Sequence, residues 1–253
     1  MADFGRFVWH DLLTSDVQVA SSFYASIAGW KYEPGRDGAL MIRSETEEIG
    51  RIASMPPSAA GAPPHWLGYV AVQDVDEMAR RATELGGRIV VPGTDVPGVG
   101  RFAVLADPQG AVFAIFGSDQ GPHEADRNRL GRFSWAELNT TDWESAWKFY
   151  SSLFGWKPTS SMDMGPEHGT YFMFGTDEKN SMGGMSNAAT TMKAPAHWLY
   201  YFNVADVQEG VKAVEAAGGK VLNGPMEIPG DDWIAICADP QGAHFAIYSH
   251  SRK

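Results

Sequence analysis

The sequence predicts an α+β fold made of four similar modules in two tandem copies. The first observation is an internal duplication, because residues 14–31 (TSDVQVASSFYASIAGWK) return as residues 140–157 (TTDWESAWKFYSSLFGWK). The second is the order of hydrophobic patterns. A strand-like run, an amphipathic helix and two or three more strand-like runs follow one another four times along the chain. Helices over one face of small, mostly antiparallel sheets are typical of the α+β class.

The duplication also predicts the domain organisation. The block HWL at 65–67 returns at 197–199, and DPQG at 107–110 returns at 239–242. A repeat of more than 100 residues indicates two whole domains rather than a solenoid. We therefore expect a first domain at 1–118, a polar linker at 119–132 and a second domain at 133–253.

Start and stop signals place the elements of the first copy. Ser15-x-x-Gln18 is a capping box that begins a helix, and Gly29 ends this helix as a C′ glycine does. A second box, Asp74-x-x-Glu77, begins the next helix, which stops at the glycine pair 86–87. Strand-like runs lie at 7–13, 39–43, 49–53, 66–72, 88–91, 102–106 and 112–116.

The second copy repeats these signals. Capping boxes at Thr141-x-x-Glu144 and Asp206-x-x-Glu209 begin two helices, and Gly155 ends the first of them. Strand-like runs include 171–174 and 182–185. The same alternation of elements is therefore expected in both copies.

Charge and cysteine usage exclude several classes of partner. A net charge of −11 argues against binding to nucleic acid or to an anionic membrane surface. One cysteine, Cys237, leaves no internal disulfide, and its apolar neighbours indicate a buried structural thiol. We expect a cytoplasmic protein with a small-molecule ligand, without a membrane span. A monomer and a homodimer both fit the sequence.

Two motifs indicate a family. The opening order of strand, Asp16, helix with Phe23-Tyr24, then Gly29-Trp30, and the closing DPQG turn resemble the vicinal oxygen chelate superfamily. That superfamily includes glyoxalase I, bleomycin-resistance proteins, extradiol dioxygenases and fosfomycin-resistance enzymes. The resemblance covers nearly the whole chain, and the two-domain form is similar to a hydroxylase-like branch that includes mycobacterial antigens. It implies βαβββ modules paired into curved, partly open β-barrels with helices outside and one cavity per domain.

The resemblance also implies where metal ligands would lie. The usual His, Glu and Gln ligands come from the first and last strands of each module, and the metal acts as a Lewis acid. None of the side chains at those positions is a ligand for zinc, nickel or iron. A shift of one residue would add His10 without completing a site. We therefore predict a metal-independent protein; the positions are Trp9, Arg51, Leu67 and Ala114, then Trp135, Gly184, Leu199 and Ala246.

Strand alternation predicts which side chains share the cavity face with these positions. The second cavity combines more polar groups, so we expect function there first. The loop residue Arg101 is a candidate for an anionic ligand, and Trp198 is a candidate for stacking on a planar one. The predicted ligand-binding residues are Trp9, Tyr69, Arg101, Trp135, Asn139, Trp198, Tyr201, Asn203 and Tyr248.

Three candidate groups carry the chemistry. Glu137 with His244 would form a general base, although hydrogen bonds from Glu137 to other donors and an exposed His244 are the favoured alternative. Asp11 matches Glu137, either as pocket chemistry or as an inherited salt bridge. Residues 162–168 coincide with six extra residues of the second copy and form a candidate lid. For the tryptophans and for Arg101, core packing and solvent exposure remain the alternatives.

Three functions compete. We favour a metal-independent protein that binds a planar or aromatic small molecule in cavities lined by Trp, Tyr and Met. The second is an enzyme that uses Glu137 and His244 or a bound organic cofactor, hydroxylase-like or lyase/isomerase. The third is a glyoxalase-type lyase with a noncanonical metal. The resemblance implies a flavin- or deazaflavin-like compound as the organic ligand.

Overall fold

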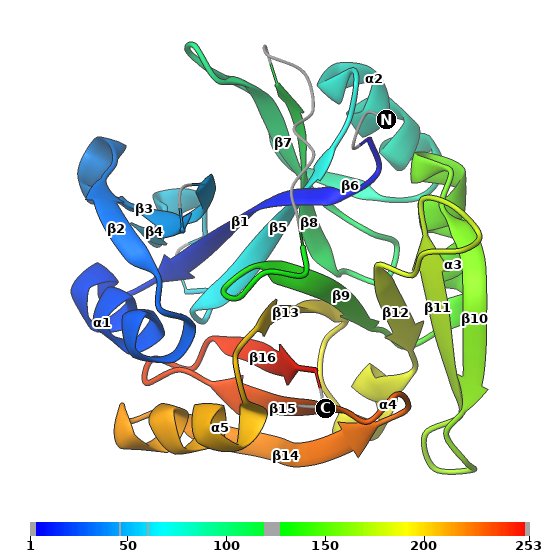
Figure 1. Cartoon of the computed structure of the whole chain (residues 1–253). Helices are drawn as coiled ribbons and strands as arrows, with labels where there is room; N and C mark the ends of the chain where they lie inside the picture. The colour runs from blue at the N-terminus through cyan, green and yellow to red at the C-terminus, as the bar shows by residue number, and fades with distance from the viewer. Residues whose placement is uncertain (1–3, 46, 60, 119–126, 251–253) are drawn as a thin grey trace. The chain divides into compact units, whose positions relative to one another are not determined.

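The computed structural model describes residues 4–45, 47–59, 61–118 and 127–250 (Figure 1). Four βαβββ modules follow one another along the chain and confirm the predicted α+β fold. The first module contains β1 (Phe7–Thr14), α1 (Val17–Ala28), β2 (Lys31–Pro34), β3 (Leu40–Ser44) and β4 (Glu47–Ser54). The second contains β5 (His65–Ala71), α2 (Val75–Glu84), β6 (Arg88–Val96), β7 (Gly100–Ala106) and β8 (Val112–Ser118).

The first copy also has two short 3-10 helices, Arg36–Gly38 and Pro57–Ala59. The second copy repeats the order of strands and long helices and adds a short α-helix. The third module contains β9 (Phe133–Asn139), α3 (Trp143–Phe154), β10 (Lys157–Asp163), β11 (Thr170–Gly175), β12 (Gly183–Ser186) and α4 (Ala188–Met192). The fourth contains β13 (His197–Asn203), α5 (Val207–Ala216), β14 (Lys220–Ile228), β15 (Asp232–Ala238) and β16 (His244–Ser249). In the described residues, no helix is long and apolar enough to cross a membrane.

The strands belong to two sheets of eight, one for each sequence copy. Their orders are β2-β3-β4-β1-β5-β8-β7-β6 and β10-β11-β12-β9-β13-β16-β15-β14. In every module the first and last strands run parallel, as β1 does to β4 and β9 to β12. The strands after each helix pair antiparallel with their sequence neighbours. This register places position 11 opposite 51 and position 137 opposite 184.

Compact packing groups the modules across the two copies. One unit holds the described residues of 1–8, 68–125 and 135–198, and the other holds those of 9–67, 126–134 and 199–253. Each unit therefore contains one module from each copy, with α2 packed on α3 in the first and α1 on α5 in the second. The predicted boundaries at 118 and 133 separate the two sequence copies. The compact units instead combine modules from both copies, whose helices pack together.

A hydrogen-bonded chain of three side chains joins the modules of the unit that contains α2 and α3. Trp198 donates its Nε1–H to the Tyr150 hydroxyl (3.1 Å), and Tyr150 donates to Oδ2 of Asp107 (3.1 Å). The other oxygen of Asp107 accepts the backbone N–H groups of Gln109 and Ala111. The buried carboxylate of the DPQG turn thus has its hydrogen-bonding capacity used on both oxygens.

The other unit contains the same arrangement. Trp66 donates to Tyr24 (3.0 Å), and Tyr24 donates to Asp239 (3.3 Å). The rings of Trp30 and Tyr24 stack with centroids 5.6 Å apart. Trp66 and its counterpart Trp198 are therefore core residues of their units, 5% and 7% exposed, which is the packing alternative given for them above.

Each DPQG glutamine caps a helix of the other module in its unit. Gln109 accepts the backbone N–H of Asp142 (2.9 Å) and donates to its carbonyl (2.7 Å), and Gln241 bonds Asp16 in the same way. Asp16 is the N-cap of α1 and accepts from Gln18 N–H (2.9 Å). The capping boxes predicted at Ser15 and Thr141 are wrong by one residue, because the following carboxylates accept the helix N–H groups. The predicted caps at Asp74 and Asp206 are confirmed.

Two strands were missed by the periodicity. β2 and β10 are sheet edges with mostly exposed side chains, so no apolar alternation marks them. The candidate lid at 162–168 comprises the last two residues of β10 and most of the turn that leads to β11. Met162 pairs with Tyr171 in this hairpin.

Residues 127–132, the described part of the predicted linker, are hydrogen-bonded to the unit that contains α1 and α5. Asn203 donates from Nδ2 to the carbonyls of Arg127 (2.7 Å) and Arg129 (3.1 Å), and Trp30 Nε1–H donates to the carbonyl of Gly131 (2.7 Å). Residues 127–132 are therefore a docked segment rather than a free linker, and 119–126 lie outside the described residues. The prediction that Cys237 is a buried thiol is confirmed, and burial raises its pKa to about 12.

Replacing Tyr24 with Phe tests the hydrogen-bonded chain. The change leaves the buried Trp66 N–H and one oxygen of Asp239 without this partner, so we expect unfolding free energy to fall by about 1–3 kcal/mol in urea titrations. Tyr32→Phe is the matched control, because the buried Tyr32 hydroxyl has no hydrogen-bond partner among the described residues. Equal losses in the two variants would contradict the role of the chain.

Candidate functional site

An ion pair between a buried carboxylate and a partly exposed guanidinium joins β1 to β4 in the first copy. Asp11 is 1% exposed and lies opposite Arg51 in the parallel register. Nε and Nη2 of Arg51 donate to Oδ2 of Asp11 at 3.0 and 2.8 Å, and Trp9 Nε1–H donates to Oδ1 at 2.8 Å. Both carboxylate oxygens are engaged, while 41% of the Arg51 side chain is exposed. The exposed charge of this cluster is therefore positive.

The equivalent strands of the second copy carry a different cluster. Trp135 donates its Nε1–H to the Tyr171 hydroxyl (2.9 Å), which donates to Oε2 of Glu137 (3.1 Å). Burial, reinforced by the charge of Glu137, raises the pKa of the Tyr171 phenol well above its usual value. The phenol therefore stays protonated and acts as a hydrogen-bond donor to the carboxylate.

A glycine makes room for this tyrosine. Gly184 lies opposite Glu137 in the register, at the position that Arg51 occupies in the first copy. A Cβ on Gly184 would lie 2.3 Å from Cζ of Tyr171, closer than real side chains approach. The second copy thus replaces a guanidinium with a phenol that comes from the neighbouring strand β11.

The other predicted cavity residues divide between core and surface. Tyr69 is 6% exposed, with its ring 6.1 Å from that of Phe102, and Tyr201 is 4% exposed. Asn139 is buried at the end of β9, and Asn203 is buried by its bonds to the docked segment 127–132. These four residues fill their units rather than present polar groups to solvent.

Of two further predicted site residues, His244 is exposed and Arg101 is half-buried. His244 lies on the surface at the start of β16, which agrees with the alternative given for it above. Arg101 bonds to Asp76 (3.0 Å) and Asp95 (2.8 Å), and its side chain is 35% exposed. The acidic neighbours of Arg101 compete with any anionic ligand for the same guanidinium.

Tyr248 belongs to a cluster that the sequence did not indicate. Its hydroxyl donates to Asp232, and Nδ1 of His250 lies 2.9 Å from that hydroxyl and 3.2 Å from Oδ1 of Asp232. Burial and the bond to Asp232 raise the pKa of Tyr248. Asp232 begins β15 and His250 follows the end of β16. The sequence could have indicated this cluster only if the pairing of the two strands had been predicted.

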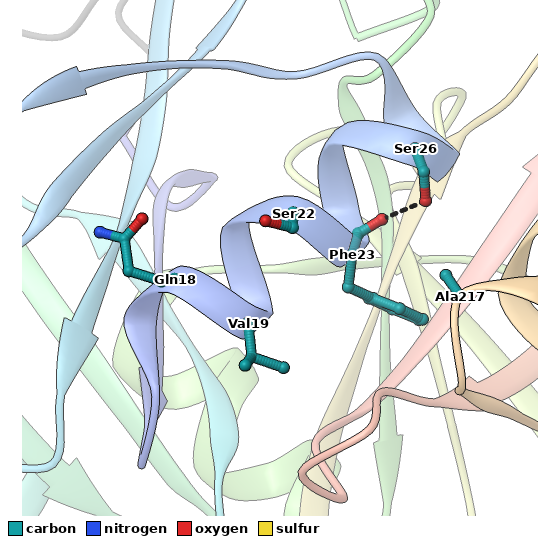
Figure 2. A pocket seen from close by; sticks show the side chains of 6 residues that line it. All are labelled: Gln18, Val19, Ser22, Phe23, Ser26 and Ala217. Carbon is teal, nitrogen blue, oxygen red and sulfur yellow. Dashed lines mark hydrogen bonds between the residues drawn. The ribbon is translucent and has the colours of Figure 1, made fainter.

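A shallow groove is lined by none of the predicted site residues. It has a volume of about 500 Å³ and is open to solvent along α1 (Figure 2). Its lining combines apolar and hydroxyl side chains without a charged group. The lining residues are Gln18, Val19, Ser22, Phe23, Ser26 and Ala217.

Comparisons with known proteins agree with this fold. Residues 132–247 match the family described as "Glyoxalase/Bleomycin resistance protein/Dioxygenase superfamily", and residues 8–116 match "Glyoxalase-like domain". The chain belongs to this superfamily. The prediction made from the motifs is thereby confirmed, and both copies carry the family pattern.

Known relatives match this chain over nearly its whole length. "Putative glyoxylase CFP32" of Mycobacterium tuberculosis is 33% identical over 94% of this chain and 92% of its own. "Anthracycline biosynthesis protein DauV" of Streptomyces sp. is 28% identical over 96% and 92%. The crystal structure of the Mn(II)-bound glyoxalase from Novosphingobium aromaticivorans has a TM-score of 0.69 at 12% identity, covering 100% of this chain and 84% of that chain. That likeness establishes the fold.

The side chains at the implied ligand positions of this superfamily member do not fit a divalent metal ion. Asp11 is the only carboxylate of its cluster, and Arg51 places a positive charge 2.8 Å from it. In the second copy Gly184 supplies no donor, and Glu137 accepts from Tyr171. Among the described residues, no group of three or more His, Cys, Asp or Glu side chains could hold a metal ion.

His10 does not supply a ligand to this face. It is 4% exposed, and its ring stacks on Phe133 with centroids 3.8 Å apart and meets Tyr200 edge-on at 4.9 Å. Burial, with the charge of Arg127, lowers the pKa of His10 well below its usual 6.5. Strand alternation points His10 away from its neighbours Trp9 and Asp11, so a register shift of one residue brings no metal ligand.

The contacts of two residues in these clusters were not predicted from the sequence. Arg51 was placed at its correct strand position but not paired with Asp11. Tyr171 was predicted to lie on a strand but not to contact Trp135 and Glu137. A signal for Tyr171 did exist, because the small Gly184 beside a large aromatic on the next strand indicates close packing.

His10 predicts a pH dependence of stability. The unfolded chain binds a proton on His10 near pH 6.5 that the folded chain does not, so its contribution is complete above pH 6.5 and is lost as pH falls below it. We expect wild type to lose up to about 1.4 kcal/mol per pH unit from this group between pH 6.5 and 5.5. His10→Phe should remove that loss in urea titrations, and the exposed His168→Gln control should keep it. An unchanged slope in His10→Phe would contradict the assignment.

Proposed function

We propose that this superfamily member is a metal-independent protein that binds a planar aromatic small molecule on the Trp135, Tyr171 and Glu137 cluster. The supporting observation is the replacement of ligand-type side chains at the implied metal positions by a hydrogen-bonded aromatic pair. Trp135 and Tyr171 are half-buried, which leaves part of each ring accessible to a ligand. Aromatic faces offer large contact area and prefer offset or edge-on contacts with another ring.

Glu137 would orient the ligand. The half-buried carboxylate already accepts from Tyr171 and would accept a hydrogen bond from a hydroxyl or amino group on the ligand. Met162, opposite Tyr171 on β10, would supply an adaptable apolar neighbour. A few placed polar groups among apolar ones are typical of small-molecule sites.

The names of two relatives support an aromatic ligand. DauV and DnrV of Streptomyces are both named anthracycline biosynthesis proteins, and anthracyclines contain fused planar rings. Their identities of 28% and 27% extend over 96% of this chain. A flavin is another planar aromatic compound that such contacts would suit.

An acid–base enzyme is the second candidate. The observation that favours it is the short chain from Trp135 through the protonated Tyr171 phenol to Glu137, which fixes the carboxylate. A fixed carboxylate beside a bound ring is able to accept a proton from a ligand hydroxyl. Loss of turnover in Glu137→Gln with binding retained would distinguish this function from binding alone.

Calorimetric titration with a hydroxyanthraquinone tests the proposed function. We expect protein treated with a chelator and dialysed to bind the probe as strongly as untreated protein. Trp135→Leu should weaken binding about 3–10-fold, because an aromatic contact contributes about 0.5–1.5 kcal/mol.

Trp143→Leu is the matched control. Trp143 is also half-buried, but it stacks on Phe172, whose side chain points to the opposite face of β11 from Tyr171. Binding should be unchanged in this variant. Loss of binding on chelation with recovery on adding Mn²⁺ would contradict the proposal, as would equal weakening in the two tryptophan variants.

A further inference from the structure

We propose that the first-copy cluster of Trp9, Asp11 and Arg51 binds the carboxylate of a planar aromatic acid through Arg51. The inference extends the proposed function, because it gives the first copy a ligand class of its own. It concerns a different cluster from Trp135, Tyr171 and Glu137.

The guanidinium of Arg51 is fixed before any ligand arrives. Nε and Nη2 both donate to the same oxygen of Asp11, at 3.0 and 2.8 Å. The carboxylate is 1% exposed and held from its other oxygen by Trp9. A guanidinium held in this way loses little side-chain entropy when it meets an anion.

The exposed part of the cluster is cationic. Asp11 is buried, so its negative charge meets no ligand directly, whereas 41% of the Arg51 side chain is exposed. The chain carries a net charge of −11, so most of its surface repels an anion. A ligand carboxylate would therefore be attracted to this point by charge-assisted hydrogen bonds.

The neighbours of Arg51 suit a flat, partly apolar ligand. Met41 lies directly opposite Arg51 on β3, and the half-buried Trp9 shares the Asp11 carboxylate with it. An apolar thioether and an indole beside a guanidinium match a ring that bears a carboxylate. The ring would lie along Trp9 and Met41 with its acid group on Arg51.

The second copy has no guanidinium at the equivalent position to attract a carboxylate. Its equivalent of Arg51 is Gly184, and the space is filled by the neutral phenol of Tyr171, with Glu137 as the charged group. The two copies are thus expected to prefer ligands of different charge. Duplication followed by this replacement would give one chain two distinct sites.

Calorimetric titration of the full chain with 2-naphthoate and with its neutral isostere 2-naphthamide tests this inference. We expect Arg51→Gln to weaken naphthoate binding about 10-fold or more, because a hydrogen bond to a charged group contributes about 1.5–3 kcal/mol. Naphthamide binding should change less than 3-fold. Arg43→Gln is the matched control, since Arg43 on β3 pairs with Glu33 (3.0 Å) and is 30% exposed.

A double variant separates loss of the binding group from loss of stability. Removing Arg51 alone leaves Asp11 buried without its counter-ion, so Asp11→Asn with Arg51→Gln removes both charges together. The folded double variant should show the same loss of naphthoate binding. Naphthoate binding that is absent from wild type, or equal in wild type and the double variant, would overturn the inference. The hydroxyanthraquinone result at Trp135 is independent of either outcome.

Discussion

The buried carboxylates Asp107 and Asp239 hold each compact unit together. Each begins the DPQG turn between the last two strands of a module and accepts two backbone N–H groups there. Its second oxygen accepts a hydrogen bond from a tyrosine on a helix of the other module. Burial raises the pKa of both carboxyls, and the hydrogen bonds to the charged form oppose that rise. The turn and the tyrosine–tryptophan chain converge on this one acceptor, and the glutamine of the same turn bonds the helix start.

The same constraint positions the two candidate sites. Once α1 and α3 are fixed at their N-termini by Gln241 and Gln109, the strands before them, β1 and β9, are fixed in direction. Parallel pairing then sets Asp11 opposite Arg51 and Glu137 opposite Gly184. The backbone is therefore conserved between the copies, and the chemistry differs through a few side chains. A guanidinium in the first copy and a phenol in the second each donate a hydrogen bond to a carboxylate at the equivalent strand position.

Much of this organisation could be predicted from the sequence because it is local or repeated. Helix N-caps at Asp74 and Asp206, the C-terminal Gly29 and Gly155, and most strands follow from short-range chemistry. Because the sequence is duplicated, a helix or strand signal that is weak in one copy is supported by the matching signal in the other. The edge strands β2 and β10 were missed because an exposed edge needs no apolar alternation.

The candidate sites were only partly predictable, because they depend on pairing between strands. Trp9, Asp11, Trp135 and Glu137 were found by alternation on single strands. Tyr171, Asp232 and His250 were not, since each meets its partners from another strand or from beyond a strand end. Asn203 looked like a cavity residue, but its amide holds the segment 127–132, a contact 74 and 76 residues away in sequence. Long-range hydrogen bonds of this kind leave no pattern in a single sequence.

Native mass spectrometry combined with elemental analysis, on protein purified without chelator, tests the proposal that these clusters bind an organic molecule without a metal ion. We expect no stoichiometric divalent metal and a bound organic mass that leaves on unfolding. One divalent ion per sequence copy would contradict metal-free binding and favour metal-dependent chemistry of the superfamily.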